Sequence, residues 1–224
     1  MKIAIIGYGK MGHAVEEYAL KMGHEVVCRI DAGEAWPESL GADVAVEFTT
    51  PTTAVENMLR CLERGVPVVC GTTGWYDRYA EVADECRRRG GRMLTATNFS
   101  LGMNIMFALN EHLARLMRGS AYRAAITETH HVHKLDAPSG TAITLQQQIV
   151  EHGGRRAEEV PITSYREGEV PGTHTVEYAS EADTIYLTHE AHSRLGLAQG
   201  AVVAAAWLAA AAPGVYTMKD VLNG

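Results

Sequence analysis

Over residues 1–100, the hydrophobic positions alternate between two spacings. Short runs that are apolar or β-branched throughout are typical of strands buried on both faces. Between these runs, apolar residues recur every three or four positions, as they do on one face of a helix. Strands and helices that alternate in this way predict a parallel sheet covered on both sides, which is a doubly wound α/β domain. The expected strands span residues 2–7, 25–30, 43–48, 66–70 and 92–97.

The helices expected between these strands are amphipathic. In the first of them, Met11, Val15, Tyr18 and Met22 share one face. The next two span 53–64 and 76–89, and glycine follows each of them, as it commonly does just past a helix C-terminus.

After residue 100 the pattern changes. A long amphipathic helix over 101–118 precedes a strand at 122–129 and a helix from about 139 to 152. Residues 173–178 and 184–188 alternate as antiparallel strands do, after a polar loop at 153–161. This second part predicts a smaller α+β domain with an open mixed or antiparallel sheet. The uncharged, alanine-rich segment 195–213 is too short for a membrane span, so we expect residues 195–224 to return to the first domain (1–100) and residues 101–194 to form the second.

Composition narrows the class of partner. The 224 residues are 46% hydrophobic and 21% charged, as in an ordinary folded protein, and the net charge is −7. No overall positive field attracts nucleic acid or anionic lipid, so we expect neither partner, and an anionic substrate would need a local basic pocket. Four cysteines without a CxxC pair, and no secretory leader in the opening run, favour the cytoplasm.

A glycine-rich loop follows the first expected strand and opens the first helix, with the sequence Gly7-Tyr8-Gly9-Lys10-Met11-Gly12. In a strand–turn–helix setting, this spacing suits the pyrophosphate of a dinucleotide, which the helix N–H groups then face. Asp31 ends the second strand, near the usual position of the acid that binds the ribose. It favours NADH, whereas Arg29 or Lys10 would tolerate the 2′-phosphate of NADPH, so both cofactors stay open. The alternatives are a tight turn that binds nothing and an Asp31 that only caps a strand end.

Small polar residues recur at further strand ends, where open α/β sheets bind their ligands. Their backbone groups are suited to the ribose and the nicotinamide amide. Besides Thr49 and Thr50, these residues are Gly71, Thr72, Thr73, Ala96, Thr97, Asn98 and Phe99.

Residues 128–142, the reactive segment, concentrate titratable side chains beside a helix start. Histidine can exchange a proton near neutral pH, and the segment holds His130, His131 and His133. Lys134 adds a cation. The helix begins at Pro138-Ser139-Gly140-Thr141, with proline in its first turn and Ser139 or Asp136 as its cap, and its free N–H groups suit a carboxylate.

Other interpretations of the histidines remain. His130 and His131 would face opposite sides of a regular strand, so both reach one substrate only if the strand ends there. The alternative to a functional site is that the reactive segment is only a polar loop. A metal site would draw on His130, His131 and His133 with His189 and His192, but the last two are one residue short of the zincin spacing and no cysteine joins them; we expect no metal. Arg194 either binds a substrate carboxylate or holds the junction between the two domains.

The reactive segment, Glu128-x-His130-His131-x-x-Lys134-x-Asp136-Ala-Pro-Ser-Gly-Thr-Ala142, resembles the motif of the 4-hydroxy-tetrahydrodipicolinate reductase (dihydrodipicolinate reductase) family. The likeness extends to Gly71-Thr-Thr-Gly74, Ala96-Thr-Asn-Phe-Ser100 and Met218-Lys-Asp-Val-Leu222. It implies an enzyme of the diaminopimelate route to lysine. The enzyme would reduce a cyclic dicarboxylate with NADH or NADPH, with loss of water.

The resemblance also implies roles for single residues. His130 matches the proton donor and acceptor, and Lys134 matches a proton donor. Substrate contacts match His131, Ser139, Gly140 and Thr141. Cofactor contacts match Gly7, Tyr8, Gly9, Lys10, Met11, Gly12, Asp31, Gly71, Thr72, Thr73, Ala96, Thr97, Asn98 and Phe99. The substrate site lies in the second domain and the cofactor site in the first, which favours a closure step.

Two features depart from the family pattern. The glycine loop is one residue shorter, and about half a strand hairpin is missing between residues 171 and 184. In the family this sheet builds a homotetramer, so the resemblance implies a homo-oligomer whose size is open. The rival interpretations are another imino-acid reductase on the same scaffold, such as an aspartate dehydrogenase, and a dinucleotide sensor without catalysis.

Overall fold

The computed structural model describes residues 1–193 and 195–224. The chain divides into two compact units: Met1–Leu101 with Leu195–Gly224 form the first, and Gly102–Arg194 form the second. Arg194, whose role the sequence left open, lies outside the described residues.

The first unit contains a six-stranded sheet in the order β10-β5-β4-β3-β1-β2, with all paired strands parallel. After β2 the chain returns to the opposite side of β1, so the order reverses between β1 and β3, the place where such sheets bind ligands. The strands are β1 (Lys2–Ile6), β2 (Glu25–Ile30), β3 (Val44–Glu47), β4 (Val68–Cys70), β5 (Arg92–Thr95) and β10 (Gly214–Tyr216).

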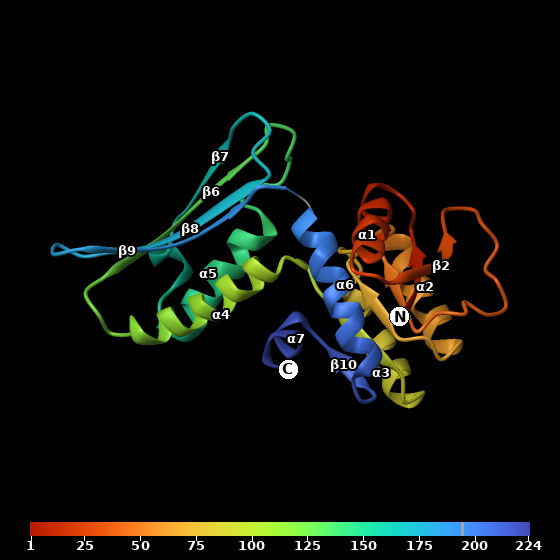
Figure 1. Cartoon of the computed structure of the whole chain (residues 1–224). Coiled ribbons are helices and arrows are strands. Elements are labelled where there is room, and N and C mark those ends of the chain that lie inside the picture. The colour runs from red at the N-terminus through yellow and green to blue at the C-terminus, as the bar shows by residue number, and fades with distance from the viewer. Residues whose placement is uncertain (194) are drawn as a thin grey trace. The chain divides into compact units, whose positions relative to one another are not determined.

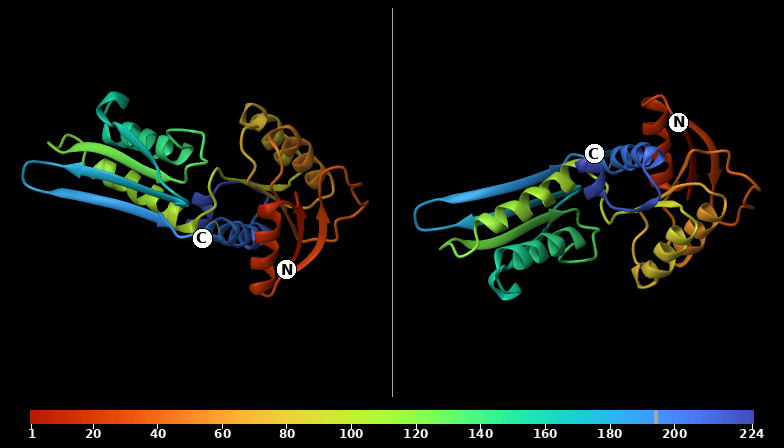
Figure 2. Two further views of the ribbon diagram at one scale, coloured as in Figure 1. Left: turned by 90° about the horizontal axis from the view of Figure 1, so that it is seen from above. Right: turned by 90° about the horizontal axis from the view of Figure 1, so that it is seen from below.

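Helices cover both faces of this sheet (Figure 2). On one face, α2 (Pro51–Glu63) and α3 (Tyr79–Arg88) pack through residues such as Met58 and Val82. The other face is covered by α1 (Lys10–Lys21) and α6 (Leu195–Ala210), whose alanines sit against Ile3 and Leu94. The short η1 (Tyr76–Arg78) and α7 (Met218–Asn223) complete the unit. The predicted doubly wound domain is confirmed, and the alanine-rich segment is a buried helix of it.

The second unit has a four-stranded sheet in the order β7-β6-β8-β9, covered on one face by α4 (Leu101–Leu116) and α5 (Gly140–Gly153) (Figure 1). Strand β6 (Arg123–His130) pairs in parallel with β7 (Ile162–Arg166) and antiparallel with β8 (Gly172–Ala179), which pairs antiparallel with β9 (Thr184–Ala191). The sheet is therefore mixed, one of the two arrangements predicted. The segment before β7 contains a single 3-10 turn, η2 (Ala157–Glu159).

Two expectations about the second unit need correction. Strand β7 was not predicted, because its only aliphatic residue is Ile162 and none of its residues is fully buried, as befits an edge strand. Helix α5 begins at Gly140 after Ser139 as the N-cap, so Pro138 precedes the helix instead of lying in its first turn. The reason is that the Ser139 side chain accepts the Ala142 N–H at 3.2 Å, which sets the cap there.

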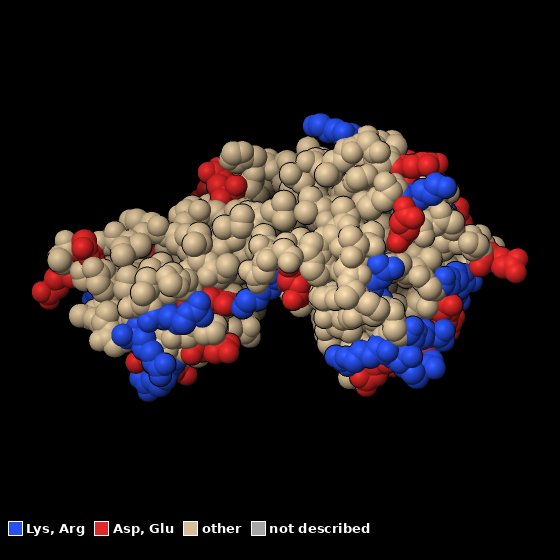
Figure 3. Space-filling view, turned by 60° about the horizontal axis from the view of Figure 1, so that its bottom comes forward, with Lys and Arg blue, Asp and Glu red and all other residues tan. Residues whose placement is uncertain are grey.

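Surface charges of opposite sign lie next to one another on the face shown in Figure 3. The basic run at the end of α3 illustrates this, because Arg87 pairs with Asp84 while Arg88 and Arg89 pair with Glu85. These cations are neutralised locally, as expected of a solvated helix end. None of the described helices combines the length and the hydropathy that crossing a bilayer requires.

Candidate active site

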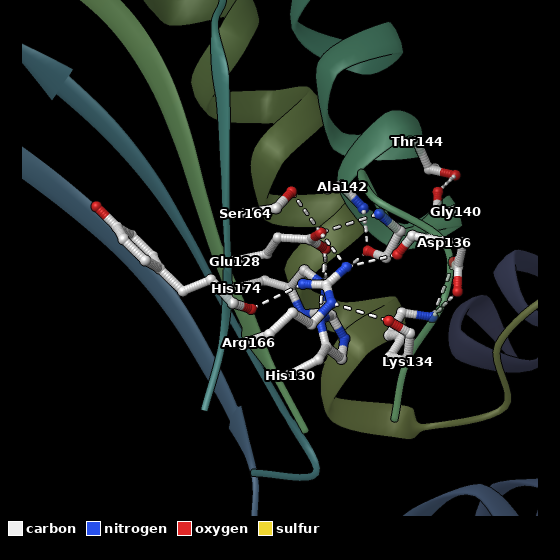
Figure 4. Close-up of polar contacts among 12 residues, drawn as sticks. Glu128, His130, Lys134, Asp136, Gly140, Ala142, Thr144, Ser164, Arg166 and His174 are labelled. Carbon is white, nitrogen blue, oxygen red and sulfur yellow. Dashed lines mark hydrogen bonds and ion pairs between the residues drawn. The ribbon is translucent and has the colours of Figure 1, made fainter. Parts of the chain in front are cut away.

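Strand register brings the polar residues of the second unit together. On β6, alternate residues point inward, so Glu128 and His130 lie on the same buried face as Ile126. The pairing places Ser164 of β7 on one side of Glu128 and His174 of β8 on the other. Residues far apart in sequence therefore meet at one carboxylate because of the sheet, as Figure 4 shows.

The fully buried Glu128 carboxylate has two different sides. Oε1 accepts hydrogen bonds from the Ser139 N–H (3.0 Å) and the Ser164 hydroxyl (2.8 Å), and an Arg166 guanidinium nitrogen lies 3.5 Å away. Oε2 has no hydrogen-bond partner among the described residues and faces Nδ1 of His130 at 3.5 Å and Nε2 of His174 at 3.6 Å. Burial alone would raise the pKa of Glu128, but the hydrogen bonds from Ser139 and Ser164 outweigh it and hold the pKa below its usual value. The group is therefore an anion at neutral pH.

The two imidazoles around this carboxylate are held edge to face, with ring centroids 4.9 Å apart. Burial lowers the pKa of His130, and the charge of Glu128 opposes part of that shift. Burial, together with the neighbouring His130, lowers the pKa of His174 to about 4, so His174 is neutral at physiological pH. The charge of Glu128 opposes part of the downward pKa shift of both rings.

Arg166 ties the reactive segment to the sheet. Its Nε donates to the carbonyl oxygen of Lys134 at 3.2 Å, and its Nη2 donates to the carbonyl oxygen of Asp136. The Lys134 ammonium lies 2.8 Å from both carboxylate oxygens of Asp136, and this lysine side chain is 23% exposed. A substrate carboxylate can reach Lys134 by displacing Asp136.

The start of α5 offers N–H groups, but Glu128 already uses one of them. The Ser139 side chain is buried, and its hydroxyl lies 3.2 Å from Nε2 of His174 in addition to capping the helix. Gly140 is exposed and Thr141 is half-buried, with open space where a side chain of residue 140 would lie. The backbone at Gly140 and Thr141 is therefore the exposed part of the predicted anion cradle.

The structure separates the predicted histidines. His130 is buried in the second unit. His131 follows the end of β6, and its ring lies 6.0 Å from that of His133. His133 is on the surface, where it pairs with Glu169. The alternative metal site considered from the sequence, with His131, His133, His189 and His192 as ligands, is not assembled among the described residues. Among the described residues, the group that could hold an ion is Glu128, His130 and His174, whose ligand atoms lie within 4.8 Å of one another. Because Arg166 shares that carboxylate, a divalent cation would meet a positive charge there, and we retain the expectation of no metal.

Sequence reasoning missed three of the residues around Glu128. His174 stood in a segment correctly predicted as an alternating strand, on the same face as Val176 and Tyr178, so a histidine in an inward position was the available signal. Arg166 and Ser164 belong to the strand that was not predicted. Glu128 was part of the motif without a role of its own.

The glycine loop of the first unit fits a dinucleotide. Gly7 has a φ of +91°, and a Cβ there would lie 2.0 Å from the carbonyl oxygen of Phe48. A Cβ on Gly12 would lie 2.3 Å from the carbonyl oxygen of Gly7, whereas Gly9 faces open space. No side chain caps α1, so its N-terminal N–H groups are available to a phosphate.

Next to this loop, the end of β2 carries the groups that would meet the ribose. Oδ1 of the exposed Asp31 accepts the Tyr8 N–H at 3.3 Å. Arg29 is held by Glu16, which binds both its Nη2 and its Nε (3.2 Å for the latter), and Glu16 also accepts the Tyr8 hydroxyl.

The other strand ends of the first unit are joined to one another. Thr72 accepts the Thr49 N–H at 2.7 Å and is itself buried, and Gly71 packs against the ring of Phe48, where a Cβ would lie 2.0 Å away. Phe99 is buried with its ring 5.8 Å from that of Phe48. The predicted cofactor residues with exposed side chains are Lys10, Asp31, Thr73 and Thr97.

Comparison with known proteins identifies the relatives of this chain. A family described as "Dihydrodipicolinate reductase, N-terminus" matches residues 1–99, and one described as "Dihydrodipicolinate reductase, C-terminus" matches residues 102–222. The chain is 44% identical to the 4-hydroxy-tetrahydrodipicolinate reductase of Christiangramia forsetii, over 100% of this chain and 98% of the relative. It is 35% identical to that of Archaeoglobus fulgidus over the full length of both.

Solved structures agree on the fold. The dipicolinate-bound dihydrodipicolinate reductase from Paenisporosarcina sp. TG-14 has a TM-score of 0.84 at 22% identity and covers 98% of each chain. An aspartate dehydrogenase from Thermotoga maritima has a TM-score of 0.51 at 14% identity, covering 91% of this chain and 94% of its own. These likenesses concern the fold alone, but the sequence relatives go further and confirm the resemblance drawn from the motif. The chain belongs to the dihydrodipicolinate reductase family.

Proposed function

We propose that the protein is the reductase of lysine and diaminopimelate biosynthesis that converts 4-hydroxy-tetrahydrodipicolinate to tetrahydrodipicolinate with a nicotinamide cofactor, with loss of water. The observation that carries this is the identity of 44% to a reductase of that name along the whole chain. The buried Glu128–His130–His174 cluster beside Lys134 supports it, because it gives a proton-transfer group next to a cation.

For the substrate, we propose a cyclic dicarboxylate bound at the reactive segment. Two carboxylates need two positive sites, and Lys134 and the helix N–H groups at Gly140 and Thr141 supply them. His131 and Ser139 complete the proposed substrate contacts, with Ser139 acting through the cap that positions those N–H groups. His130 exchanges a proton with the substrate, and Lys134 is a second proton donor. A nicotinamide supplies the hydride when it is bound.

We propose that the cofactor is bound by the glycine loop, Asp31 and the joined strand ends of the first unit, and that NADH is preferred. Asp31 accepts hydrogen bonds, which suits the free 2′-hydroxyl of NADH and repels a 2′-phosphate. Arg29, the cation that would tolerate the phosphate, is engaged by Glu16 on two of its nitrogens.

We propose that the protein acts in the cytoplasm as a homo-oligomer. All four cysteines are free, which fits a reducing compartment. In the second unit, helices cover one face of the sheet, and the large side chains Tyr165 and Tyr186 are exposed on its strands. Light scattering after gel filtration measures the oligomeric state.

The test of function is direct. Purified protein, supplied with the product formed by the preceding synthase from pyruvate and aspartate semialdehyde, should consume NADH. His130→Ala and Lys134→Ala should each lower kcat by about 10²-fold or more while leaving the Kd for NADH unchanged. No loss of nicotinamide absorbance with either cofactor would overturn the proposal. Turnover of aspartate instead would identify an aspartate dehydrogenase, and tight cofactor binding without any turnover would identify a sensor.

A further inference from the structure

Two buried atoms of the candidate active site face each other without hydrogen-bond partners. One is Oε2 of Glu128, and the other is Nδ1 of His130, at a separation of 3.5 Å. A carboxylate oxygen only accepts hydrogen bonds, and an imidazole nitrogen can donate one. A small movement of either side chain joins the two atoms and removes the unfavourable free energy of leaving both unsatisfied.

The competing partner of Oε2 is His174, and it is engaged elsewhere. Its Nε2 lies 3.6 Å from Oε2 but 3.2 Å from the Ser139 hydroxyl. The other oxygen of Glu128 is held in place by Ser139 and Ser164, so the carboxylate cannot rotate to present a different atom. The geometry therefore favours His130 as the group that Oε2 serves.

The other ring nitrogen of His130, Nε2, is accessible from outside the cluster. The ring keeps 9% exposure although Nδ1 is fully buried, so the exposed part of the ring is away from Glu128. Position 172 is a glycine, and a Cβ there would lie 3.1 Å from Nε2 of His130. The absence of a side chain at Gly172 leaves Nε2 accessible.

We propose that Glu128 is the positioning residue of His130: its Oε2 accepts the Nδ1 proton, so that Nε2 is the atom that exchanges protons with the substrate. The same carboxylate stabilises the imidazolium that forms when Nε2 takes up a proton. This inference rests on the proposed role of His130 in proton transfer. It adds the atom that reacts and the residue that selects it.

The pKa of His130 depends on all the charged groups around it, and Glu128 is one of them. Lys134 and Asp136 face it from the segment after β6, Arg166 from β7 and His174 from β8. Burial, Lys134 and Arg166 lower the pKa of His130, and Glu128 is the first of the groups that raise it. Removing the charge of Glu128 should therefore lower the pKa of His130 further and move the acidic limb of the kcat profile to lower pH.

The substitution Glu128→Gln separates charge from shape. Ser139 and Ser164 donate to the Oε1 position, so the amide oxygen should occupy it and the amide NH2 should replace Oε2. The NH2 group donates toward Nδ1 of His130, which must then be the acceptor. Glu128→Gln should consequently move the proton of neutral His130 from Nδ1 to Nε2.

Nitrogen NMR of histidine-labelled protein tests this without any substrate. The protein has ten histidines, and His130→Gln identifies the resonances of His130. We expect neutral His130 to carry its proton on Nδ1 in the unsubstituted protein and on Nε2 in Glu128→Gln. In parallel, kcat should fall by about 10²-fold with KM for the dicarboxylate and Kd for NADH unchanged.

Two variants serve as controls. Ser164→Ala removes a hydrogen bond to Oε1 but keeps the charge at Oε2, so the tautomer should stay on Nδ1. Glu47→Gln makes the same chemical change in the first unit and should leave His130 as it was. A proton on Nε2 in the unsubstituted protein, or no change of tautomer in Glu128→Gln, overturns the proposal. The first of these outcomes needs no variant to fold, and both can occur in a protein that still reduces its substrate.

Discussion

Among the described residues, each unit buries one glutamate completely, and the two carboxyl groups have different partners. Glu47, at the end of β3, accepts from the Thr49 hydroxyl, the Asn57 amide (3.5 Å) and the Cys70 thiol (3.0 Å). These donors are neutral side chains. Glu128, on β6, is surrounded by a guanidinium and two imidazoles in addition to a hydroxyl and a backbone N–H.

The difference lies in whether the partners of each carboxylate can change charge. Neutral donors satisfy Glu47 and hold neighbouring strand ends together, and none of them changes charge near neutral pH. The partners of Glu128 include His130, so a proton added to or removed from the site changes the energy of the carboxylate. Burial alone therefore does not distinguish the two carboxyl groups, whereas the titratable partners around Glu128 do.

The largest effect expected from this comparison is on stability. Glu128→Ala leaves Arg166 and the Ser139 N–H without their buried anion and should lower the free energy of unfolding by about 3–5 kcal/mol. Glu47→Ala leaves neutral donors unsatisfied and should lower it by about 1–3 kcal/mol. Denaturant unfolding followed by circular dichroism gives these values.

Tryptophan fluorescence gives a second probe of the same pair. All three tryptophans, Trp36, Trp75 and Trp207, lie in the first unit, so their emission reports the unit that holds Glu47. The comparison fails if Glu47→Ala destabilises the protein as much as Glu128→Ala does.

Periodicity predicted most of the first unit because buried parallel strands and amphipathic helices each have a characteristic local spacing of apolar residues. The glycine loop and the reactive segment were found for the same reason, since their residues are close together in the chain. His174, Arg166 and Ser164 reach Glu128 only through the register of β6 with its neighbours, which no local pattern encodes. Edge strand β7 lacks the apolar alternation that would have revealed it. The residues of the motif could therefore be picked out from the sequence, whereas the groups around Glu128 could be identified only from the structure.

A second prediction, of somewhat smaller size, concerns pH. The folded pKa of His174 is about 4, against 6.5 for the free side chain. Between these two pH values the unfolded chain binds a proton at His174 that the folded protein does not bind. Stability should be fully present above pH 6.5 and should fall as pH drops toward 4, by about 3 kcal/mol from this residue. Glu128 acts in the same direction below pH 4.5, because its folded pKa is lowered. Among the described residues, the hydrogen-bond partners of Glu47 include no imidazole and no cation.

Unfolding free energies measured between pH 7 and 4 check this prediction. His174→Gln keeps an amide near Ser139 but removes the titration, so the dependence on pH should become flatter, and Glu47→Gln should keep the original slope. An unchanged slope in His174→Gln would show that the acid sensitivity arises elsewhere.

The smallest effect comes from a third carboxylate, the partly exposed Glu16, which extends the comparison from buried groups to the cofactor site. Its side chain is 14% exposed and binds Arg29, whose own side chain is 42% exposed. Because solvent screens such a pair, its loss changes the free energy by at most about 1 kcal/mol. Glu16→Gln releases Arg29 toward the 2′-phosphate and should therefore strengthen NADPH binding about fivefold. Nicotinamide fluorescence at equilibrium measures Kd for both cofactors without turnover. Glu17→Gln removes the same charge from an exposed neighbour on α1 and should change neither Kd. If Glu17→Gln strengthens NADPH binding equally, the effect is general electrostatics, and Arg29 is not the residue that Glu16 restrains.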